Sequence, residues 1–166
     1  MAAQKIKSMN DLEQFQQDLL SGRQEYKARV LICATGCRAL GAQGVAAKFR
    51  EKLQSLSLDK QVHVVETGCI GMCAHAPVML IEPYEYLYGG VSIEDIDEII
   101  STTIQEGQAV ERLAVVQDGK SVPGIKNVDF YKKQTRLVLE NCGRIDPRKI
   151  EDAIERGAYL SAVEIR

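Results

Sequence analysis

The sequence lacks an excess of charge of either sign. Its 21 Lys and Arg residues are offset by 23 Asp and Glu residues, which leaves a formal net charge of -2. Proteins that bind nucleic acid or acidic membranes by electrostatics carry a clustered basic surplus. We therefore expect no nucleic-acid partner for this chain.

Long apolar runs are also missing. No stretch approaches the roughly 20 apolar residues that cross a bilayer, and residues 1–10 have none of the apolar character of a signal peptide. We expect a cytoplasmic protein without direct membrane insertion. In that reducing compartment structural disulfides are rare, and the odd number of cysteines, five, leaves one over in any case. Metal or redox chemistry is then the favoured use of the cysteines.

Four of the five cysteines form two pairs with the same spacing. Cys33 and Cys37 follow one apolar run, Cys69 and Cys73 follow another, and three residues separate the members of each pair. An iron–sulfur cluster needs thiolates that converge from separate loops, and a 2Fe-2S centre takes two thiolates on each iron. We predict such a cluster on these four residues, with electron transfer as the function. Cys142 is the spare and is expected to be a small buried side chain.

Three other uses of the four thiols are alternatives to a 2Fe-2S cluster. A four-cysteine zinc site is the strongest competitor, although structural zinc usually takes a two-residue spacing within each pair. Thiol–disulfide exchange favours Cys-x-x-Cys at a helix start, which is absent. A Rieske-like centre would replace two cysteines by histidines, but all four thiols are present. We expect His75 to lie on the loop or to donate near the cluster, and His63 to lie within a strand.

Hydrophobic periodicity predicts an α/β domain. Helices are predicted over 9–26, 39–55 and 92–107, and strands over 28–32, 61–66, 77–81 and 84–88. A strand, a helix and a second strand in this order normally form a right-handed crossover with parallel strands. Both cysteine loops would then meet at the same edge of the sheet, and the last two strands would form a hairpin.

The composition changes after residue 112, where turn-forming residues become frequent. We expect one domain over 1–112, a linker over 113–126 and a helical segment over 127–166. Within the last segment, helices are predicted over 129–140 and 148–160. These helices have too little core of their own, so we expect them to pack on the first domain, on a partner or on a continuation of the chain.

Several stretches resemble the thioredoxin-like 2Fe-2S ferredoxin family. The resemblance is carried by Cys69-Ile70-Gly71-Met72-Cys73-Ala74-His75-Ala76-Pro77, read together with Ala34-Thr35-Gly36-Cys37-Arg38-Ala39 upstream. Within the family the chain is most similar to the module at the start of NADH-binding flavoprotein subunits of NAD-linked hydrogenases and formate dehydrogenases, relatives of the flavoprotein subunit of respiratory complex I. The stretch 84–95 also matches that module, and 141–147 is similar to the beginning of its FMN and NADH domain.

The resemblance implies a thioredoxin-like ferredoxin domain, a small mixed sheet flanked by helices, followed by a C-terminal helical connector. It also implies an electron-transfer module of an NADH:acceptor oxidoreductase, which passes single electrons between a flavin and cluster chain and partner subunits of a multi-subunit complex. FMN, NADH and a 4Fe-4S cluster are expected only in a missing remainder or in partner subunits. The chain is not expected to be catalytic alone.

The first cysteine pair departs from the family pattern. Four residues usually separate its members, whereas three separate Cys33 from Cys37, so Cys33 leaves the strand one position late and nominally on the opposite face. This departure keeps a second hypothesis open. In that hypothesis the chain is a non-redox docking or assembly module with zinc or no metal at the four cysteines.

Overall fold

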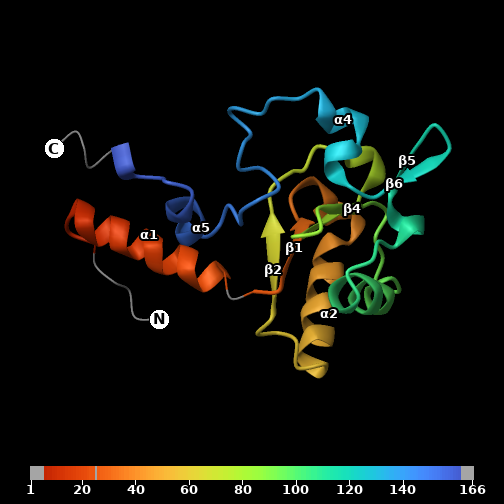
Figure 1. The fold of residues 1–166 in the computed structure, drawn as a ribbon, viewed down its shortest axis with the longest axis horizontal. Coiled ribbons are helices and arrows are strands. Elements are labelled where there is room, and N and C mark those ends of the chain that lie inside the picture. The colour runs from red at the N-terminus through yellow and green to blue at the C-terminus, as the bar shows by residue number, and fades with distance from the viewer. Residues whose placement is uncertain (1–5, 25, 162–166) are drawn as a thin grey trace.

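The main body of the protein is a four-stranded mixed sheet flanked by helices, as shown by a computed structural model that describes residues 6–24 and 26–161 (Figure 1). Its strands are β1 (Ala28–Cys33), β2 (Val62–Thr67), β3 (Met79–Glu82) and β4 (Tyr86–Tyr88), in the order β2-β1-β3-β4. β1 pairs in parallel with β2 and antiparallel with β3, and β3 and β4 form the predicted hairpin. The predicted α/β class with a small mixed sheet is confirmed.

Helix α2 (Ala42–Ser55) makes the crossover between β1 and β2. Its buried residues include Ala46, Phe49 and Leu53, whose spacing of three and four places them on one face of the helix. Full burial of a side chain such as Phe49 stabilises the fold by about 1.5–3 kcal/mol. The predicted helix over 39–55 starts later than expected, because Gly41 has a left-handed φ of 89° and separates α2 from a 3₁₀ turn over Gly36–Leu40.

The helix predicted over 92–107 also begins later. The Asp95 carboxylate accepts hydrogen bonds of 2.7 Å from both the backbone N–H and the hydroxyl of Ser92, which holds residues 92–95 in a turn. Helix α3 (Ile96–Glu98) then continues as π-helical turns over Ile99–Gln105, and Gly107 follows with φ 75°. Helical spacing predicts that the isoleucines at 93, 96, 99, 100 and 104 face inward; the last four are buried, whereas Ile93, which precedes the helix, is exposed.

The segment 113–126, where we expected a linker, contains a hairpin of β5 (Val115–Gln117) and β6 (Lys120–Val122). Isolated bridges join this region to β4, at Tyr88 with Ala114 and at Tyr86 with Gly124. Flanking 3₁₀ turns over Glu111–Leu113 and Ile125–Asn127 contribute buried Leu113 and Ile125. The hairpin therefore packs on the outer strand of the main sheet.

Beyond this hairpin the helices are shorter than predicted. Helix α4 (Asp129–Lys132) is followed by turns, so the prediction of a helix over 129–140 is wrong beyond Lys132. Leu137, Val138 and Leu139 are consecutive and exposed, and consecutive apolar residues do not share one helix face. Helix α5 (Ile150–Glu155) ends before Gly157, whose φ is 86°. Residues 162–166 of the predicted segment lie outside the described residues.

Helix α1 (Met9–Gln24) confirms the predicted opening helix, but it extends away from the sheet and packs along α5 (Figure 1). Leu12 and Ile154 are buried, Arg23 pairs with Glu155, and the Gln16 amide donates to the Glu155 carbonyl at 3.2 Å. We call α1 and α5 together the helical arm. Within the described residues, no helix is both long and apolar enough to span a membrane.

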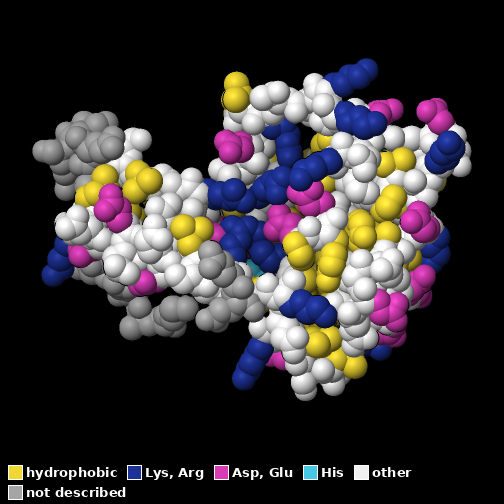
Figure 2. All heavy atoms as spheres, viewed as in Figure 1, with side chains coloured by type: hydrophobic (Ala, Val, Ile, Leu, Met, Phe, Trp, Pro, Cys, Tyr) yellow, Lys and Arg dark blue, Asp and Glu magenta, His cyan; other side chains and the backbone are white. Residues whose placement is uncertain are grey.

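The loop before α5 is tied to the sheet by ion pairs. Glu82 on β3 accepts hydrogen bonds from Arg29 at 2.7 Å and from Arg144 at 3.0 Å. Glu66 on β2 pairs with Arg50 at 2.8 Å and with Arg148 at 3.3 Å. Lys and Arg side chains accordingly gather where this loop lies between the main body and the helical arm (Figure 2).

Candidate metal centre

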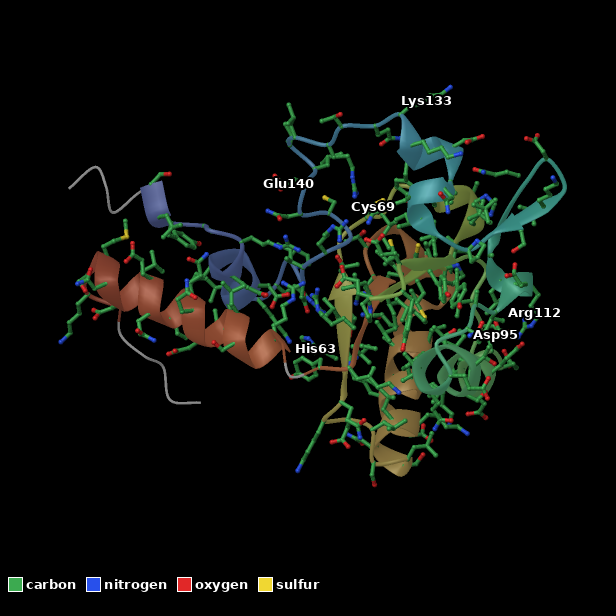
Figure 3. The ribbon with its side chains drawn as sticks, viewed as in Figure 1. His63, Cys69, Asp95, Arg112, Lys133 and Glu140 are labelled. Carbon is green, nitrogen blue, oxygen red and sulfur yellow. The ribbon has the colours of Figure 1, made fainter. Side chains whose placement is uncertain are left out.

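The two cysteine loops begin at neighbouring strand ends. Cys33 is the last residue of β1 and is in register with Thr67, the last residue of β2. The ladder extends one step further, because the Ala34 N–H donates to the Thr67 carbonyl at 3.0 Å. Cys69 follows two residues later, and Figure 3 shows it just beyond the end of β2. The parallel crossover thus brings the two loops together, as the order of elements predicted.

The first pair is buried. Cys33 and Cys37 are 3% and 2% exposed, and Cys37 lies in the 3₁₀ turn that leads to α2. The pKa of Cys37 is raised to about 11, mainly by burial and also by hydrogen bonding with the Cys33 thiol and the charges of Cys33 and Cys73, while a hydrogen bond from the Val78 backbone opposes the shift. Burial also acts against ionisation of Cys33, but hydrogen bonds from the Ile70 backbone and from Cys37 outweigh it, so the pKa of Cys33 lies below its usual value. The 3₁₀ turn therefore brings these two thiols within reach of each other despite their short spacing.

The second pair is exposed. Cys69 and Cys73 lie on a loop whose buried residue is Ile70, and Gly71 between them has φ 99°. Such a left-handed conformation suits glycine, and it turns the chain between the two cysteines. Burial raises the pKa of Cys69, as do the charges of Cys33 and Cys73, while a hydrogen bond from the Gly71 backbone opposes the shift. Cys69 thus interacts with thiols of both pairs.

The donor set around the sulfurs fits a cluster. Backbone groups of Ile70, Gly71 and Val78 hydrogen-bond to Cys33, Cys69 and Cys37 respectively. Such amide donors stabilise negative charge on thiolate sulfur.

The side chain of Thr67 provides a further test of whether the site suits a cluster. Its hydroxyl oxygen is buried and has no hydrogen-bond partner, and the residue is fully buried. Because Thr67 and Cys33 are in register on neighbouring strands, their side chains point to the same face of the sheet. A buried hydroxyl normally has a partner, and a sulfur atom of a cluster held by Cys33 would supply an acceptor on this face.

The thiols lie in two pairs, one on each loop. A tetrahedral zinc site needs four ligands around one ion, whereas a two-iron cluster takes two thiolates on each iron. Among residues 6–24 and 26–161, no three His, Cys, Asp or Glu side chains are placed to hold a single metal ion.

The two histidines do not extend the site. His75 is exposed in the 3₁₀ turn Cys73–His75, and its carbonyl accepts a hydrogen bond from the Gly90 N–H at 2.7 Å. His63 lies toward the opposite end of β2 from Cys69, as Figure 3 shows, and stacks on Tyr26 at 4.9 Å between ring centroids. Two histidines on one iron, as a Rieske-like centre requires, are therefore not available here.

Three residues beside the second loop were not predicted from the sequence. A Cβ atom added at Gly89 would lie 2.8 Å from the His75 Cβ, so a glycine is needed for the loop to approach β4. The Tyr131 hydroxyl donates to the Ile70 carbonyl at 2.7 Å. Cys142 is half-buried, and its Sγ lies 4.0 Å from where a Cβ of Gly68 would be. The Gly89-Gly90 pair was a visible signal, but no local pattern marks Tyr131 or Cys142.

Comparisons with known proteins point to one family. A sequence model of the thioredoxin-like 2Fe-2S ferredoxin family matches residues 18–104. A 2Fe-2S ferredoxin of Clostridium pasteurianum is 32% identical over 99 residues, which cover 54% of this chain and 96% of that protein. A 2Fe-2S ferredoxin of Aquifex aeolicus is 37% identical over 93 residues, covering 54% of this chain and 79% of that protein. The crystal structure of a wild-type thioredoxin-like 2Fe-2S ferredoxin from Aquifex aeolicus superposes with a TM-score of 0.51 at 30% identity, covering 56% of this chain and 99% of that one.

Proposed function

The chain belongs to the thioredoxin-like 2Fe-2S ferredoxin family, and on that premise we propose that it holds one 2Fe-2S cluster and transfers single electrons. The ligands would be Cys33, Cys37, Cys69 and Cys73. The observation that carries the proposal is the placement of two cysteine pairs at the adjacent ends of β1 and β2, where thiols of one pair act on those of the other. Family membership supports the cluster type.

Different residues around the site would hold the cluster, donate hydrogen bonds to its sulfur ligands and leave one side open to a partner. When bound, the cluster supplies a centre that accepts and releases one electron. Cys33 and Cys37 would hold it against the core, where both side chains are buried, and the amides of Ile70 and Gly71 would donate toward sulfur and stabilise its negative charge. The exposed Cys69 and Cys73 form the side on which a partner would approach the cluster.

We also propose a setting for this carrier, in which it is a module of an NADH:acceptor oxidoreductase flavoprotein subunit. The support is the resemblance of 84–95 and 141–147 to such subunits, together with the ordered chain beyond residue 104, where the family match ends. FMN, NADH and a 4Fe-4S cluster would belong to a remainder of the protein or to partner subunits. The chain alone should therefore not oxidise NADH. A cytoplasmic location is part of the proposal, because free thiols like these five persist in a reducing compartment.

A second function, docking without electron transfer, is favoured by one observation. Leu137, Val138 and Leu139 are 80%, 97% and 58% exposed in a row, and such a run is typical of a surface that binds another protein. In this alternative the fold would carry zinc or no metal and would attach a flavoprotein to its neighbour.

Metal analysis separates the two functions. We would purify the chain without oxygen and measure iron, acid-labile sulfide and zinc per chain, followed by electron paramagnetic resonance after dithionite reduction. Two irons, two sulfides and a reduced S = 1/2 signal per chain are expected for the electron carrier. Zinc, or no metal at all, would instead support the docking module.

A further inference from the structure

The C-terminal segment 129–144 returns over the loop that carries Cys69 and Cys73. The Tyr131 hydroxyl donates to the Ile70 carbonyl at 2.7 Å, and the two residues are 61 positions apart in the chain. The Ile70 backbone also hydrogen-bonds to the Cys33 sulfur. One side chain of this segment is therefore linked, through a single residue, to a proposed ligand of the cluster.

The segment touches the same loop at three more places. A Cβ atom at Gly71 would lie 3.3 Å from the Phe130 ring, and a Cβ atom at Gly143 would lie 3.1 Å from the Ile70 side chain. Cys142 Sγ is 4.0 Å from the Cβ position of Gly68. Contacts at residues 68, 70 and 71 come from both ends of the segment, so the first part of the loop is held at three positions while Cys69 and Cys73 stay exposed.

The segment is anchored at both ends and braced across its middle. The residue before the segment, Val128, is 1% exposed and lies in the core. At the other end, the Arg144 side chain donates to Glu82 at 3.0 Å, and the Arg144 carbonyl accepts a hydrogen bond from Arg29 at 3.0 Å. Between these anchors, Arg136 donates to the Cys142 carbonyl at 3.2 Å, and its guanidinium lies 5.8 Å from the Tyr131 ring centroid. Such a segment is a fixed part of the structure and not a loose tail.

Figure 3 labels Lys133 and Glu140, which lie on this segment, and Cys69 of the second loop. The whole segment also lies beyond residues 18–104, the part that matches the ferredoxin family. Its effect on the site is therefore a feature of this chain that the family match does not supply.

We propose that residues 129–144 form a brace that holds the second cysteine loop in place, with Tyr131 as a positioning residue. The part that concerns the cluster rests on the proposed function. A loop that is held in place slows the departure of iron from the cysteines it carries.

Tyr131→Phe tests the hydrogen bond, and Tyr159→Phe, which changes an exposed tyrosine after helix α5, is the matched control. Amide hydrogen exchange would be followed by mass spectrometry on a peptide covering 68–74 and on a reference peptide from α2. We expect exchange of the loop to rise about fivefold in Tyr131→Phe, as loss of one net hydrogen bond predicts, with the α2 peptide unchanged. Iron release to a chelator should accelerate by a similar factor.

Phe130→Ala supplies a second variant, because it removes the ring beside Gly71. Loop exchange and iron release should both rise while the α2 peptide stays unchanged, which a structural defect elsewhere would not produce. The brace is refuted if both variants match Tyr159→Phe in loop exchange and in iron release. A wild-type chain without iron would refute the proposed function instead, while faster loop exchange in Tyr131→Phe would still support the contact.

Discussion

Cys33 and Cys37 are buried at the end of a central strand, whereas Cys69 and Cys73 are exposed in a loop that follows an edge strand. Both pairs have the same spacing, so spacing does not set their exposure. β1 has neighbours on both sides and its six residues are all buried, while β2 has a neighbour on one side only. The same spacing thus gives a buried cysteine pair after β1, which we call the inner anchor, and a solvent-accessible pair after β2.

The difference also explains why the second loop needs support from elsewhere. The first loop passes directly into α2, whose apolar face is part of the core. The second loop has Ile70 as its buried residue, and Tyr131 and Phe130 contact it from a distant part of the chain. Four changes, taken from the largest expected effect to the smallest, would break or sharpen this contrast.

The largest effect is expected from removing a ligand of either pair. In Cys37→Ser and in Cys73→Ser, most iron should be lost, because one of the two irons would keep only a single thiolate. The measurement is iron and sulfide per chain after anaerobic purification. The control is Cys142→Ser, which should keep its iron although its sulfur lies beside Gly68; iron loss in that variant would mean that the four ligands are wrongly assigned.

Next in size is a clash at the exposed loop. Gly89→Ala places a methyl group 2.8 Å from the His75 Cβ and 3.0 Å from its carbonyl oxygen, so the loop must move. We expect a loss of about 1–3 kcal/mol in the free energy of unfolding, measured by urea denaturation. Gly36→Ala is the counterpart at the buried loop, where nothing lies within 4 Å of the added Cβ. That variant should change stability by less than about 0.5 kcal/mol, and equal losses in the two variants would contradict this account.

Thiol labelling would compare the two pairs directly in the metal-free chain. Cys73 is exposed, while Cys37 is buried with its pKa raised to about 11. Because the thiolate is the nucleophile and a raised pKa keeps the thiol protonated at neutral pH, Cys37 should react at least about tenfold more slowly than Cys73 at pH 8. Its rate should continue to rise as the pH approaches 11. Mass spectrometry of alkylated peptides provides the measurement, and similar rates for both residues at pH 8 would show that the first pair is not shielded.

The smallest effect is expected at the inner anchor. Thr67→Val removes a buried hydroxyl without a protein partner on the face that Cys33 shares. If that hydroxyl donates to the cluster, the potential should fall by about 40 mV, which corresponds to about 1 kcal/mol for a one-electron couple. Thr102→Val, on the π-helical stretch, is the control and should leave the potential unchanged. A Thr67→Val potential equal to that of the control would exclude the hydrogen bond.

Local patterns predicted much of the fold. The apolar face of α2, the strand runs and the hairpin at Glu82-Pro83 follow from helical and alternating spacing, which short windows of sequence contain. The predictions for 129–140 and for the start of the 92–107 helix were wrong for a local reason as well. A run of three consecutive apolar residues has no helical face, and the Asp95 carboxylate competes for the backbone of Ser92.

The sequence by itself determined the two cysteine pairs and, through the strand–helix–strand order, their meeting at one edge of the sheet. Only the tertiary structure decided that one pair is buried and the other exposed, because exposure depends on which strand is central. It also decided that Gly89 lies against His75 with no room for a Cβ atom, and that the Tyr131 hydroxyl donates to the Ile70 carbonyl. These contacts join residues that are far apart along the chain, so no local spacing encodes them.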